Sequence, residues 1–423
     1  MSIISIIVLG TLILQGPTGP TLDSATPRER LAAIEAMSKP GNTDAIPALE
    51  GALKKESKSE VRQAILAGLT RIGGPRVPPI LAMSLGSDLD KDVRLQAVDS
   101  IQRFYVPVSD TGSLQTLFNR AKNLVVQQDR PMLAKGVVVD KVALDSLAGA
   151  MSKDSSEDVR ASAASTLGSL RAKEYLPAMV MTLEDPQNRD HKSVRIEIIR
   201  SLGVIRDPAG GPALMKTLRE GDAGVVKESI IAIGLIGYRD ARPQLEEIFK
   251  NDTHRDVKEQ TLQSLALLRD PAGKPLFESV LTSTNDFLRE KAVEGLARTD
   301  YDAASFADII KTEKKASVRN AMAFALVSSN HDDFINDLAN ALNSRESDQA
   351  EVYIYELGKY KGKVPQLNNY LRSSDPKVRA RMARILGQVG DPSSRAPIEE
   401  LTKDTNTDVL REAVNALRQM NFK

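Results

Sequence analysis

The stretch DVRASAASTLGSL, Asp158–Leu170, returns in altered form along almost the whole chain. Its apolar residues Val159 and Leu167 lie eight positions apart, so they fall on one side of a helix. A second copy, KVRARMARILGQV, occupies Lys377–Val389. A short amphipathic helix repeated in this way predicts a repeat architecture.

The copies follow one another at a nearly constant interval. From Val159 to Val318, the distance between successive opening apolar residues is 35, 31, 32, 31 and 30 residues. Longer gaps, such as that from Val93 to Val159, equal two intervals. The period is therefore about 31 residues. The opening residues and their apolar partners are Val61 and Leu69, Val93 and Ile101, Val159 and Leu167, Val194 and Leu202, Val225 and Ile233, Val257 and Leu265, Leu288 and Leu296, Val318 and Leu326, Val378 and Leu386, and Val409 and Leu417.

Each repeat also carries a second amphipathic segment with proline near its start. The segments are IPALEGALKK, LPAMVMTL, GPALMKTL, RPQLEEIF, KPLFESVL and VPQLNNYL. Proline is tolerated in the first turn of a helix because the N–H groups there have no acceptor within the helix, so its missing N–H costs no hydrogen bond. Turns such as Asp207-Pro208, Asp270-Pro271 and Asp391-Pro392 separate the two helices, with Asp expected to cap free N–H groups. The repeat is thus expected to be a pair of helices.

One helix pair has apolar residues on both flanks and cannot bury them alone. Stacking on neighbouring pairs buries both flanks, which predicts an all-α fold, an α-solenoid of about a dozen helix pairs. We expect the second helices to form its concave surface. The predicted divisions are an N-terminal segment (1–22), repeats (23–104), an irregular or degenerate part (105–150) and further repeats (151–423).

The repeated pattern resembles HEAT repeats of the phycobilisome-lyase-like type. It is carried by DVRASAASTLGSL, by SVRIEIIRSLGVIRDPAGGPAL and by SDPKVRARMARILGQVGDP. The resemblance extends over roughly Asp23–Lys423 and implies an armadillo-like superhelix. Such repeats occur in scaffolds, in adaptors and in a few enzymes, so function has to be argued from particular residues.

Composition excludes several classes of function. The 57 Lys and Arg balance 56 Asp and Glu, which argues against a nucleic-acid-binding protein. Cysteine is absent, which removes disulfides, thiolate nucleophiles and zinc–cysteine sites. The sequence therefore indicates a protein partner and no nucleic acid.

The N-terminus reads MSIISIIVLGTLIL and continues QGPTGPTLDS. The apolar core, Ile3–Leu14, has the length of a signal-peptide core and is short for a membrane-spanning helix. We therefore expect export to the periplasm or envelope, with membrane contact only through this segment if it stays uncleaved. The alternative is a buried first helix in a cytoplasmic protein.

An arginine follows the opening valine in many repeats. A row of such arginines could bind anions, but a residue required by every repeat is expected to serve the repeat itself. We therefore predict a structural ladder in which each arginine pairs with acidic side chains or turn carbonyls of the neighbouring repeat. Its members are Arg62, Arg94, Arg160, Arg195, Arg319 and Arg379.

The stretch EVYIYELGKYKGKVPQLNNYL, Glu351–Leu371, holds four of the eight tyrosines and three lysines. Tyrosine is frequent at interface hot spots because it combines a large area with a polar tip. This stretch is the candidate patch for partner contact, and the competing interpretation is that its tyrosines lie in the core. The candidate residues are Tyr353, Tyr355, Lys359, Tyr360, Lys361, Lys363 and Tyr370.

Catalytic motifs are missing from the sequence. His191, His254 and His331 share no metal-ligand spacing, and no paired His-Glu motif of the deoxyhypusine hydroxylase kind is present. No phosphate-binding loop or nucleophile elbow occurs either. We therefore expect no catalytic residues, no metal and no cofactor.

These patterns favour an exported, non-catalytic scaffold or adaptor that binds partner proteins along its solenoid surface. Two alternatives stay open. One is a subunit of a bilin or tetrapyrrole-protein lyase or isomerase, which only the repeat subtype suggests. The other is a purely structural spacer in the envelope.

Overall fold

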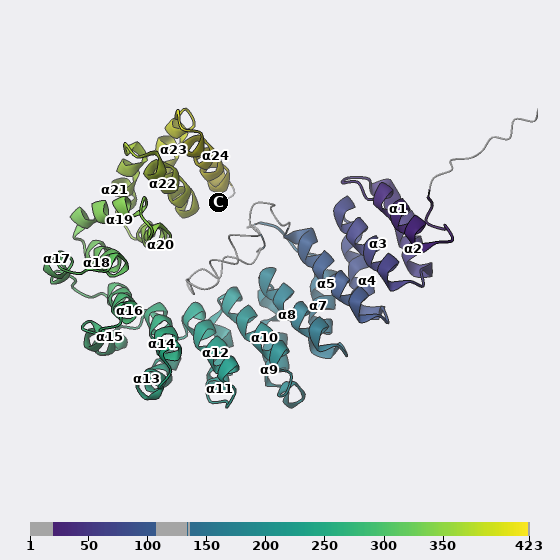
Figure 1. Ribbon diagram of the computed structural model, residues 1–423, viewed down its shortest axis with the longest axis horizontal. Coiled ribbons are helices and arrows are strands. Elements are labelled where there is room, and N and C mark those ends of the chain that lie inside the picture. Colours follow the sequence, from purple (N-terminus) through teal and green to yellow (C-terminus); the bar gives the residue numbers. More distant parts are fainter. Residues whose placement is uncertain (1–19, 107–132, 134–135, 422–423) are drawn as a thin grey trace, which may run out of the picture. The chain divides into compact units, whose positions relative to one another are not determined.

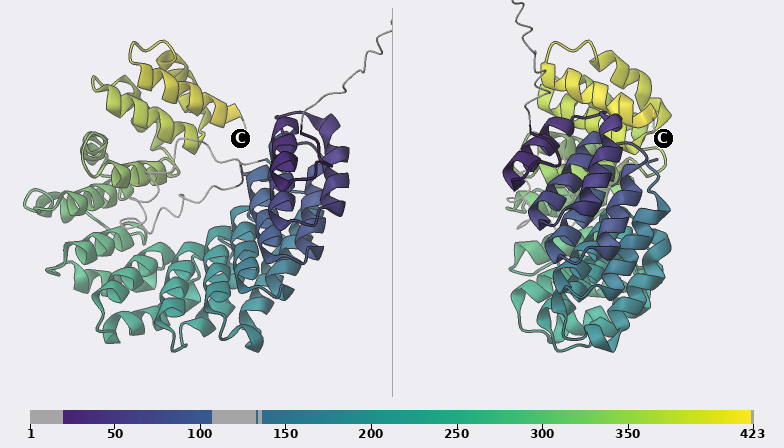
Figure 2. Two further views of the ribbon diagram at one scale, coloured as in Figure 1. Left: turned by 45° about the vertical axis from the view of Figure 1, so that its right-hand side comes forward. Right: turned by 90° about the vertical axis from the view of Figure 1, so that its right-hand side faces the viewer.

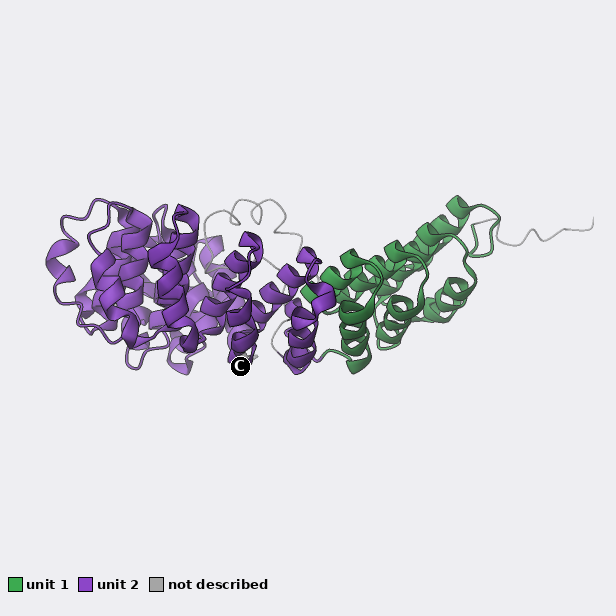
Figure 3. Ribbon diagram, turned by 90° about the horizontal axis from the view of Figure 1, so that it is seen from below, with its two compact units in different colours: residues 1–108, 139–166 green, residues 109–138, 167–423 purple. Residues whose placement is uncertain are grey.

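The computed structural model describes residues 20–106, 133 and 136–421, and every regular element in these residues is helical. Contacts divide the chain into two compact units (Figure 3): unit 1 contains residues 1–108 and 139–166, and unit 2 contains residues 109–138 and 167–423. Most of the predicted segments 1–22 and 105–150 lie outside the described residues. Within the described residues, no helix is both long enough and apolar enough to cross a bilayer.

The helices alternate between long and short ones. Unit 1 contains α1 (Pro27–Met37), α2 (Ile46–Lys55), α3 (Ser59–Ile72), α4 (Val77–Ser87), α5 (Lys91–Tyr105) and α7 (Lys141–Lys153), and its boundary with unit 2 falls within α8 (Glu157–Ser169). Unit 2 continues with α9 (Leu176–Glu184), α10 (Lys192–Ile205), α11 (Gly211–Thr217), α12 (Ala223–Ile236), α13 (Arg242–Asn251), α14 (Arg255–Leu268), α15 (Lys274–Val280), α16 (Asp286–Ala297), α17 (Phe306–Ile309), α18 (Ala316–Ser328), α19 (Ile335–Ala341), α20 (Ser347–Leu357), α21 (Val364–Asn368), α22 (Pro376–Val389), α23 (Arg395–Leu401) and α24 (Thr407–Asn421).

The repeated pairs of apolar residues form the core, as expected. In most repeats both members of the pair are buried; Val257, Leu288 and Leu417 are half-buried. Each buried aliphatic side chain contributes about 1.5–3 kcal/mol relative to exposure. The stability of the stack is thus spread over all its helix pairs, and the predicted α-solenoid is confirmed.

The Asp-Pro turns have the predicted capping role. The carboxylates of Asp207, Asp270 and Asp391 accept hydrogen bonds from the backbone N–H groups of Ala209, Ala272 and Ser393, respectively. Each proline begins a single 3₁₀ turn, η5 (Pro208–Gly210), η7 (Pro271–Gly273) or η10 (Pro392–Ser394), and the short helix follows directly. The turn therefore reverses the chain within a few residues.

Close approach of several long helices depends on a glycine near the helix end. At Gly234 of α12, an alanine Cβ would lie 2.8 Å from the Cα of Ser264 in α14. At Gly387 of α22, it would lie 2.4 Å from the Cβ of Ala416 in α24. Real Cβ atoms do not approach other carbons so closely, so only glycine permits this packing.

The long helices of unit 2 form its inner layer, and the short ones form its outer layer (Figures 1 and 2). The expectation that the second, short helices line the concave face was therefore wrong. The reason is geometric: in a curved stack the inner helices come closest together, and the Gly-to-Ser contacts place the long helices in that position.

Unit 2 bends tightly between α14 and α20. A guanidinium nitrogen of Arg269, the residue that ends α14, lies 2.6 Å from a carboxylate oxygen of Glu356 in α20. Two long helices, α16 and α18, lie between these residues in the chain. A contact that skips two helix pairs requires the stack to close on its inner side.

Candidate functional site

The predicted arginine ladder has a repeating geometry. The guanidinium of Arg62 binds both carboxylate oxygens of Asp88 at 2.8 Å and donates to the carbonyls of Glu56 and Ser57. Asp88 follows α4, the short helix of the same pair, and the two carbonyls follow α2, the short helix of the preceding pair. Each such arginine therefore joins the ends of two successive short helices.

The other predicted members use the same kinds of partner. Arg94 pairs with Asp154, Arg195 with Glu220, and Arg379 with Asp404, while Arg160 and Arg319 donate to the carbonyls of Asp154, Glu313 and Lys314. Arg30 with Glu56 and Arg289 with Glu313 also belong to the series. The sequence pattern missed them because Glu29 and Leu288 precede these arginines instead of valine.

Two of the ladder carboxylates, Asp154 and Asp404, have lowered pKa values. Burial opposes ionisation of Asp154, but hydrogen bonds from Arg94 and from the N–H of Ser156 outweigh it and lower the pKa of Asp154. At Asp404, the hydrogen bond from Arg379 is the largest influence and also lowers the pKa. At these two positions the arginine and its acid therefore form a charged pair.

The seven candidate contact residues do not form one exposed patch. Tyr353 is 1% exposed and stacks on Phe324, with ring centroids 4.7 Å apart. Lys363 is also buried and pairs with Asp332. Both predictions of a surface contact were wrong, because each side chain finds its partner on a helix that precedes it by about one repeat.

The remaining five candidates have different surroundings. Tyr355 is half-buried and lies beneath Lys359, whose ammonium is 4.0 Å from the ring centroid. Tyr360 and Tyr370 are half-buried, and the Tyr370 hydroxyl donates to Asn336 at 2.6 Å. Lys359 and Lys361 are exposed. Tyr355 and Lys359 both line one cavity of unit 2.

That cavity is a hollow of ≈ 740 Å³ on the inner side of unit 2, here called the inner hollow. The ends of α10, α12, α14 and α16 form one part of it, and α20 and α22 form the other. Its lining consists of Arg206, Gly234–Gly237, Arg239, Leu267–Arg269, Arg298, Asp348, Glu351, Val352, Tyr355, Glu356, Lys359, Ile385 and Gln388. It thus combines an apolar floor with many charged groups.

Two arginines of the inner hollow hold an unusual backbone conformation. Arg206 and Arg269 end α10 and α14 with φ of 58° and 51°. At the same place in the repeat, α12 and α22 end in Gly237 and Gly390, which also have positive φ. A side chain in this conformation costs about 1 kcal/mol relative to glycine. Arg171, which does not line the hollow, has the same conformation with φ of 52°, so this conformation is not confined to the hollow.

A buried ion network supports one side of the hollow. It comprises Glu290, Lys291, Glu294, Arg298 and Glu356, all buried. The ammonium of Lys291 lies 2.7 Å from both Glu290 and Glu294, and Arg298 joins Glu294 to Glu356. The hydroxyl of Tyr353 donates to Glu294 at 2.6 Å, which ties α20 to α16.

The ion network fixes the charges of its members. Burial opposes ionisation of Glu294, but Lys291 and Arg298 outweigh it and lower its pKa to about 2. Burial also acts against the charged guanidinium of Arg298, but Glu356 and Glu294 raise its pKa further above the usual range. Burial and then Glu294 raise the pKa of Tyr353 well above its usual value. None of these three groups titrates near neutral pH, where an acid–base catalyst has to operate.

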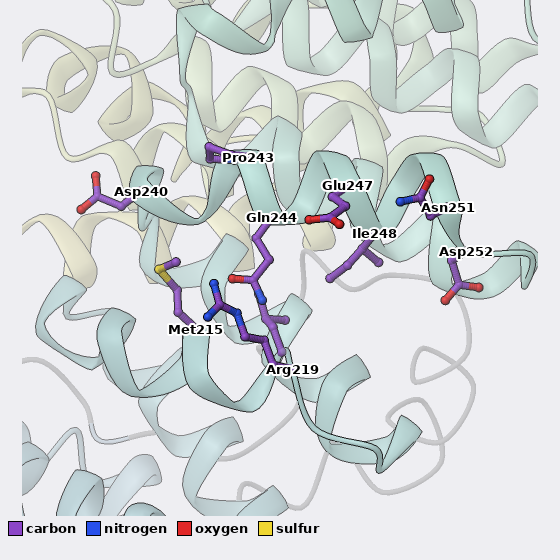
Figure 4. A pocket seen from close by; sticks show the side chains of 10 residues that line it. Met215, Arg219, Asp240, Pro243, Gln244, Glu247, Ile248, Asn251 and Asp252 are labelled. Carbon is purple, nitrogen blue, oxygen red and sulfur yellow. The ribbon is translucent and has the colours of Figure 1, made fainter.

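A second hollow, of ≈ 720 Å³, lies on the outer layer between α11 and α13 (Figure 4). The side chains of Arg219 and Gln244 reach toward one another there, and Asp240 lies at one end. A smaller groove of ≈ 270 Å³ lies between α9 and α11. Grooves between consecutive outer helices thus follow from stacking itself, whereas the inner hollow depends on the bend of unit 2.

The three histidines lie in the turns that precede or follow long helices. His254 precedes α14, and its Nδ1 is 3.0 Å from Asp252. His191 precedes α10, and His331 follows α18 with its Nδ1 3.2 Å from Ser329. Across residues 20–106, 133 and 136–421, no three His, Asp or Glu side chains are arranged to hold a metal ion.

Several residues that line the inner hollow share equivalent positions in their helices, a spacing that the sequence contains. Val352, Tyr355 and Lys359 lie three, six and ten positions after Gln349, the position in α20 that matches the opening residue of other repeats. Leu235 in α12 and Leu267 in α14 lie ten positions after Val225 and Val257. These positions form one stripe along the helix, which is rotated by about 130° around the helix axis from the buried stripe. Only the structure shows that this stripe faces the concave side.

The helix pairs, the Asp-Pro turns and the arginine ladder together define a helical repeat protein of the solenoid class. Residues 19–102, 187–266 and 364–421, about half of the chain, match the family described as HEAT repeats. The chain belongs to the HEAT-repeat family.

Comparison with known proteins adds three similarities. Deoxyhypusine hydroxylase-B of Oryza sativa subsp. japonica is 25% identical over 231 residues, which cover 53% of this chain and 75% of that protein. Yeast importin-beta, Kap95p, is 10% identical with a TM-score of 0.55, over 96% of this chain and 61% of that one. The complex of CpcE and CpcF of phycocyanin lyase from Nostoc sp. PCC7120 is 20% identical with a TM-score of 0.37, over 67% and 96%. The likeness to importin-beta supports the solenoid fold alone.

Proposed function

We propose that this protein is a non-catalytic scaffold that binds a partner protein through the inner hollow of unit 2. The observation that carries the proposal is the hollow itself. It is a concave cavity with a volume of ≈ 740 Å³, lined mainly by helix residues and supported by buried ion pairs. Rigid helices present contact residues in a fixed arrangement, which lowers the entropy cost of binding. The groups with fixed charge that surround it suit recognition better than proton transfer.

Site-specific photo-crosslinking tests the scaffold function. A photoreactive residue placed at Asp348 or Gln388, both exposed in the inner hollow, is expected to give one defined adduct in cells. The matched control is Lys250, which is exposed on the outer helix α13 and is expected to give no such adduct. Adducts of equal yield from all three positions, or from none of them, would contradict the proposal.

The bilin-lyase alternative gives a different outcome in the same preparation. A lyase subunit would yield a coloured complex or transfer a chromophore to an acceptor protein. A structural spacer would give neither a chromophore signal nor a defined adduct. The scaffold function predicts an adduct without chromophore transfer.

Export to the periplasm or envelope is part of the proposal. It rests on the apolar stretch Ile3–Leu14 and the Gly- and Pro-containing spacer that follows. N-terminal sequencing of the protein from fractionated cells is expected to show a chain that begins near Thr18, in the envelope or periplasmic fraction. A chain that begins at Met1 in the cytosolic fraction would show that the segment is not an export signal.

A further inference from the structure

The charges of the inner hollow are not balanced. Arg269 and Arg298 are paired with Glu356, and Glu351 is paired with Arg384 and Arg381. Within the described part of the chain, three cations of the lining form no ion pair, whereas Asp348 is the one carboxylate of the lining without such a partner. The three cations are Arg206, Arg239 and Lys359.

The three cations are also poorly supplied with other acceptors. The Nε of Arg239 donates to the carbonyl of Leu268 at 3.2 Å, which leaves its terminal nitrogens available. Lys359 is exposed, and its ammonium lies 4.0 Å from the centroid of the Tyr355 ring. Arg206 is exposed. Three exposed donors around one hollow favour an anionic ligand.

Arg206 ends α10 with a positive φ of 58°, a conformation that glycine has at the ends of α12 and α22. Arg171, Arg269, Asp300 and Asn330 also have a positive φ, so this conformation does not single out Arg206. Arg206 is exposed and lines the inner hollow, so its side chain can contact a ligand there.

The floor between these cations is apolar. Leu235, Leu267 and Val352 are half-buried and face the hollow, so each offers part of its surface to a ligand. A nucleic-acid backbone would bring closely spaced phosphates next to Asp348, Glu351 and Glu356. Single carboxylates separated by aliphatic side chains match the lining better, because they reach the cations and avoid these acids.

We propose that the inner hollow binds an acidic peptide segment of the partner protein, with its carboxylates on Arg206, Arg239 and Lys359 and its aliphatic side chains on Leu235, Leu267 and Val352. This inference rests on the scaffold function proposed above and specifies the chemistry of the partner. The affinity is expected to fall as salt is raised, because exposed ion pairs are screened.

The test measures binding of a fluorescently labelled peptide of about twelve residues, composed of Glu, Leu and Ser, by fluorescence polarisation. A peptide with Lys in place of every Glu is the charge-reversed control. The full chain is expected to bind the Glu peptide and not the Lys peptide. Absence of binding to the Glu peptide, or equal binding of both, would overturn the inference.

Variants of Arg206 separate binding from folding. Arg206→Gly removes the side chain and relaxes the positive φ, so the thermal midpoint is expected to hold or rise while the affinity for the Glu peptide falls. Combined with Arg239→Gln, the loss is expected to reach about tenfold. Arg171→Gly is the matched control, since Arg171 also has a positive φ, of 52°, but does not line the hollow. If Arg206→Gly binds as tightly as Arg171→Gly, the inference is wrong.

The two proposals fail in different ways. A defined crosslinked partner without an acidic segment at the adduct would leave the scaffold function in place and refute the acidic-peptide inference. Loss of every adduct from the hollow would refute the scaffold function. A labelled oligonucleotide that competes with the Glu peptide would point to a different class of ligand and contradict the inference.

Discussion

At the scale of single residues, the buried carboxylate of Glu294 has two cationic partners and one tyrosine partner. Its carboxylate accepts from Lys291 at 2.7 Å and Arg298 at 3.0 Å, and it also accepts from the hydroxyl of Tyr353. Its side chain is 3% exposed, so these partners replace water entirely. Removing one member of such a network leaves other charges buried without compensation, which costs more than the pair contributes when intact.

Glu294→Gln tests this dependence. The amide keeps the size of the side chain but leaves Lys291 and Arg298 with one fewer anion, so the free energy of unfolding is expected to fall by about 3 kcal/mol. Hydrogen exchange should show faster opening of α16 and α20, because these helices share the network. Glu247→Gln, on the exposed face of α13, is the control and should change stability by less than about 0.5 kcal/mol.

The surroundings of single residues also explain why Tyr355 of the predicted contact patch lines the inner hollow whereas Tyr353 is buried. Nothing next to Tyr353 in the chain distinguishes it from Tyr355, two residues later on the same helix. Tyr353 is buried because Phe324 and Glu294 lie against it, and both come from other helix pairs. Tyr355 lies on the neighbouring face of α20 and lines the hollow. A periodicity argument applied to this one helix would have separated the two.

Among elements, the contact between successive long helices is the recurring unit of the fold. In several long helices a glycine near the end allows the next long helix to approach, as between Gly234 and Ser264. The same glycines also set the curvature, because a closer approach on the inner side than on the outer side bends the stack. The outcome of a glycine substitution therefore depends on what its added Cβ would meet.

Gly234→Ala is expected to lower the free energy of unfolding by about 1–3 kcal/mol, because its Cβ would lie 2.8 Å from the Cα of Ser264 and the two helices would have to move apart. Gly51→Ala is the matched comparison. Gly51 lies in α2 with nothing within 4 Å of an added Cβ, and alanine there should stabilise the helix by about 0.5–1 kcal/mol. Thermal unfolding of both variants checks the opposite signs. A loss of stability in both would show that packing at Gly234 is not the cause.

On the scale of the whole molecule, stability depends on many similar ion pairs. The ladder acids Glu56, Asp154, Glu313 and Asp404 all have pKa values below the ordinary range. A carboxyl group whose pKa is lower in the folded state binds fewer protons there than in the unfolded chain. Its contribution is therefore complete above the unfolded pKa of about 4 and is lost as pH falls through the folded value.

The thermal midpoint is accordingly expected to change little between about pH 7 and 5 and to fall steeply below about pH 4. Asp404→Asn removes one ladder carboxylate, so this variant should be less stable at neutral pH and should lose less of its remaining stability on acidification. Calorimetry at several pH values measures both effects. A midpoint that falls equally in the variant and in the original chain would show that the ladder does not govern acid stability.

The repeat period, the two-helix repeat and the Asp-Pro caps could be read from local sequence, because each depends on residues within one repeat or on the identical contact between neighbours. The arginine ladder was predictable for the same reason, since every member uses equivalent partners. The concave face and the bend that brings Arg269 and Arg298 to Glu356 emerge only on folding. Curvature is the sum of small rotations between successive helix pairs, so contacts 58 and 87 residues apart in the chain are absent from any local pattern.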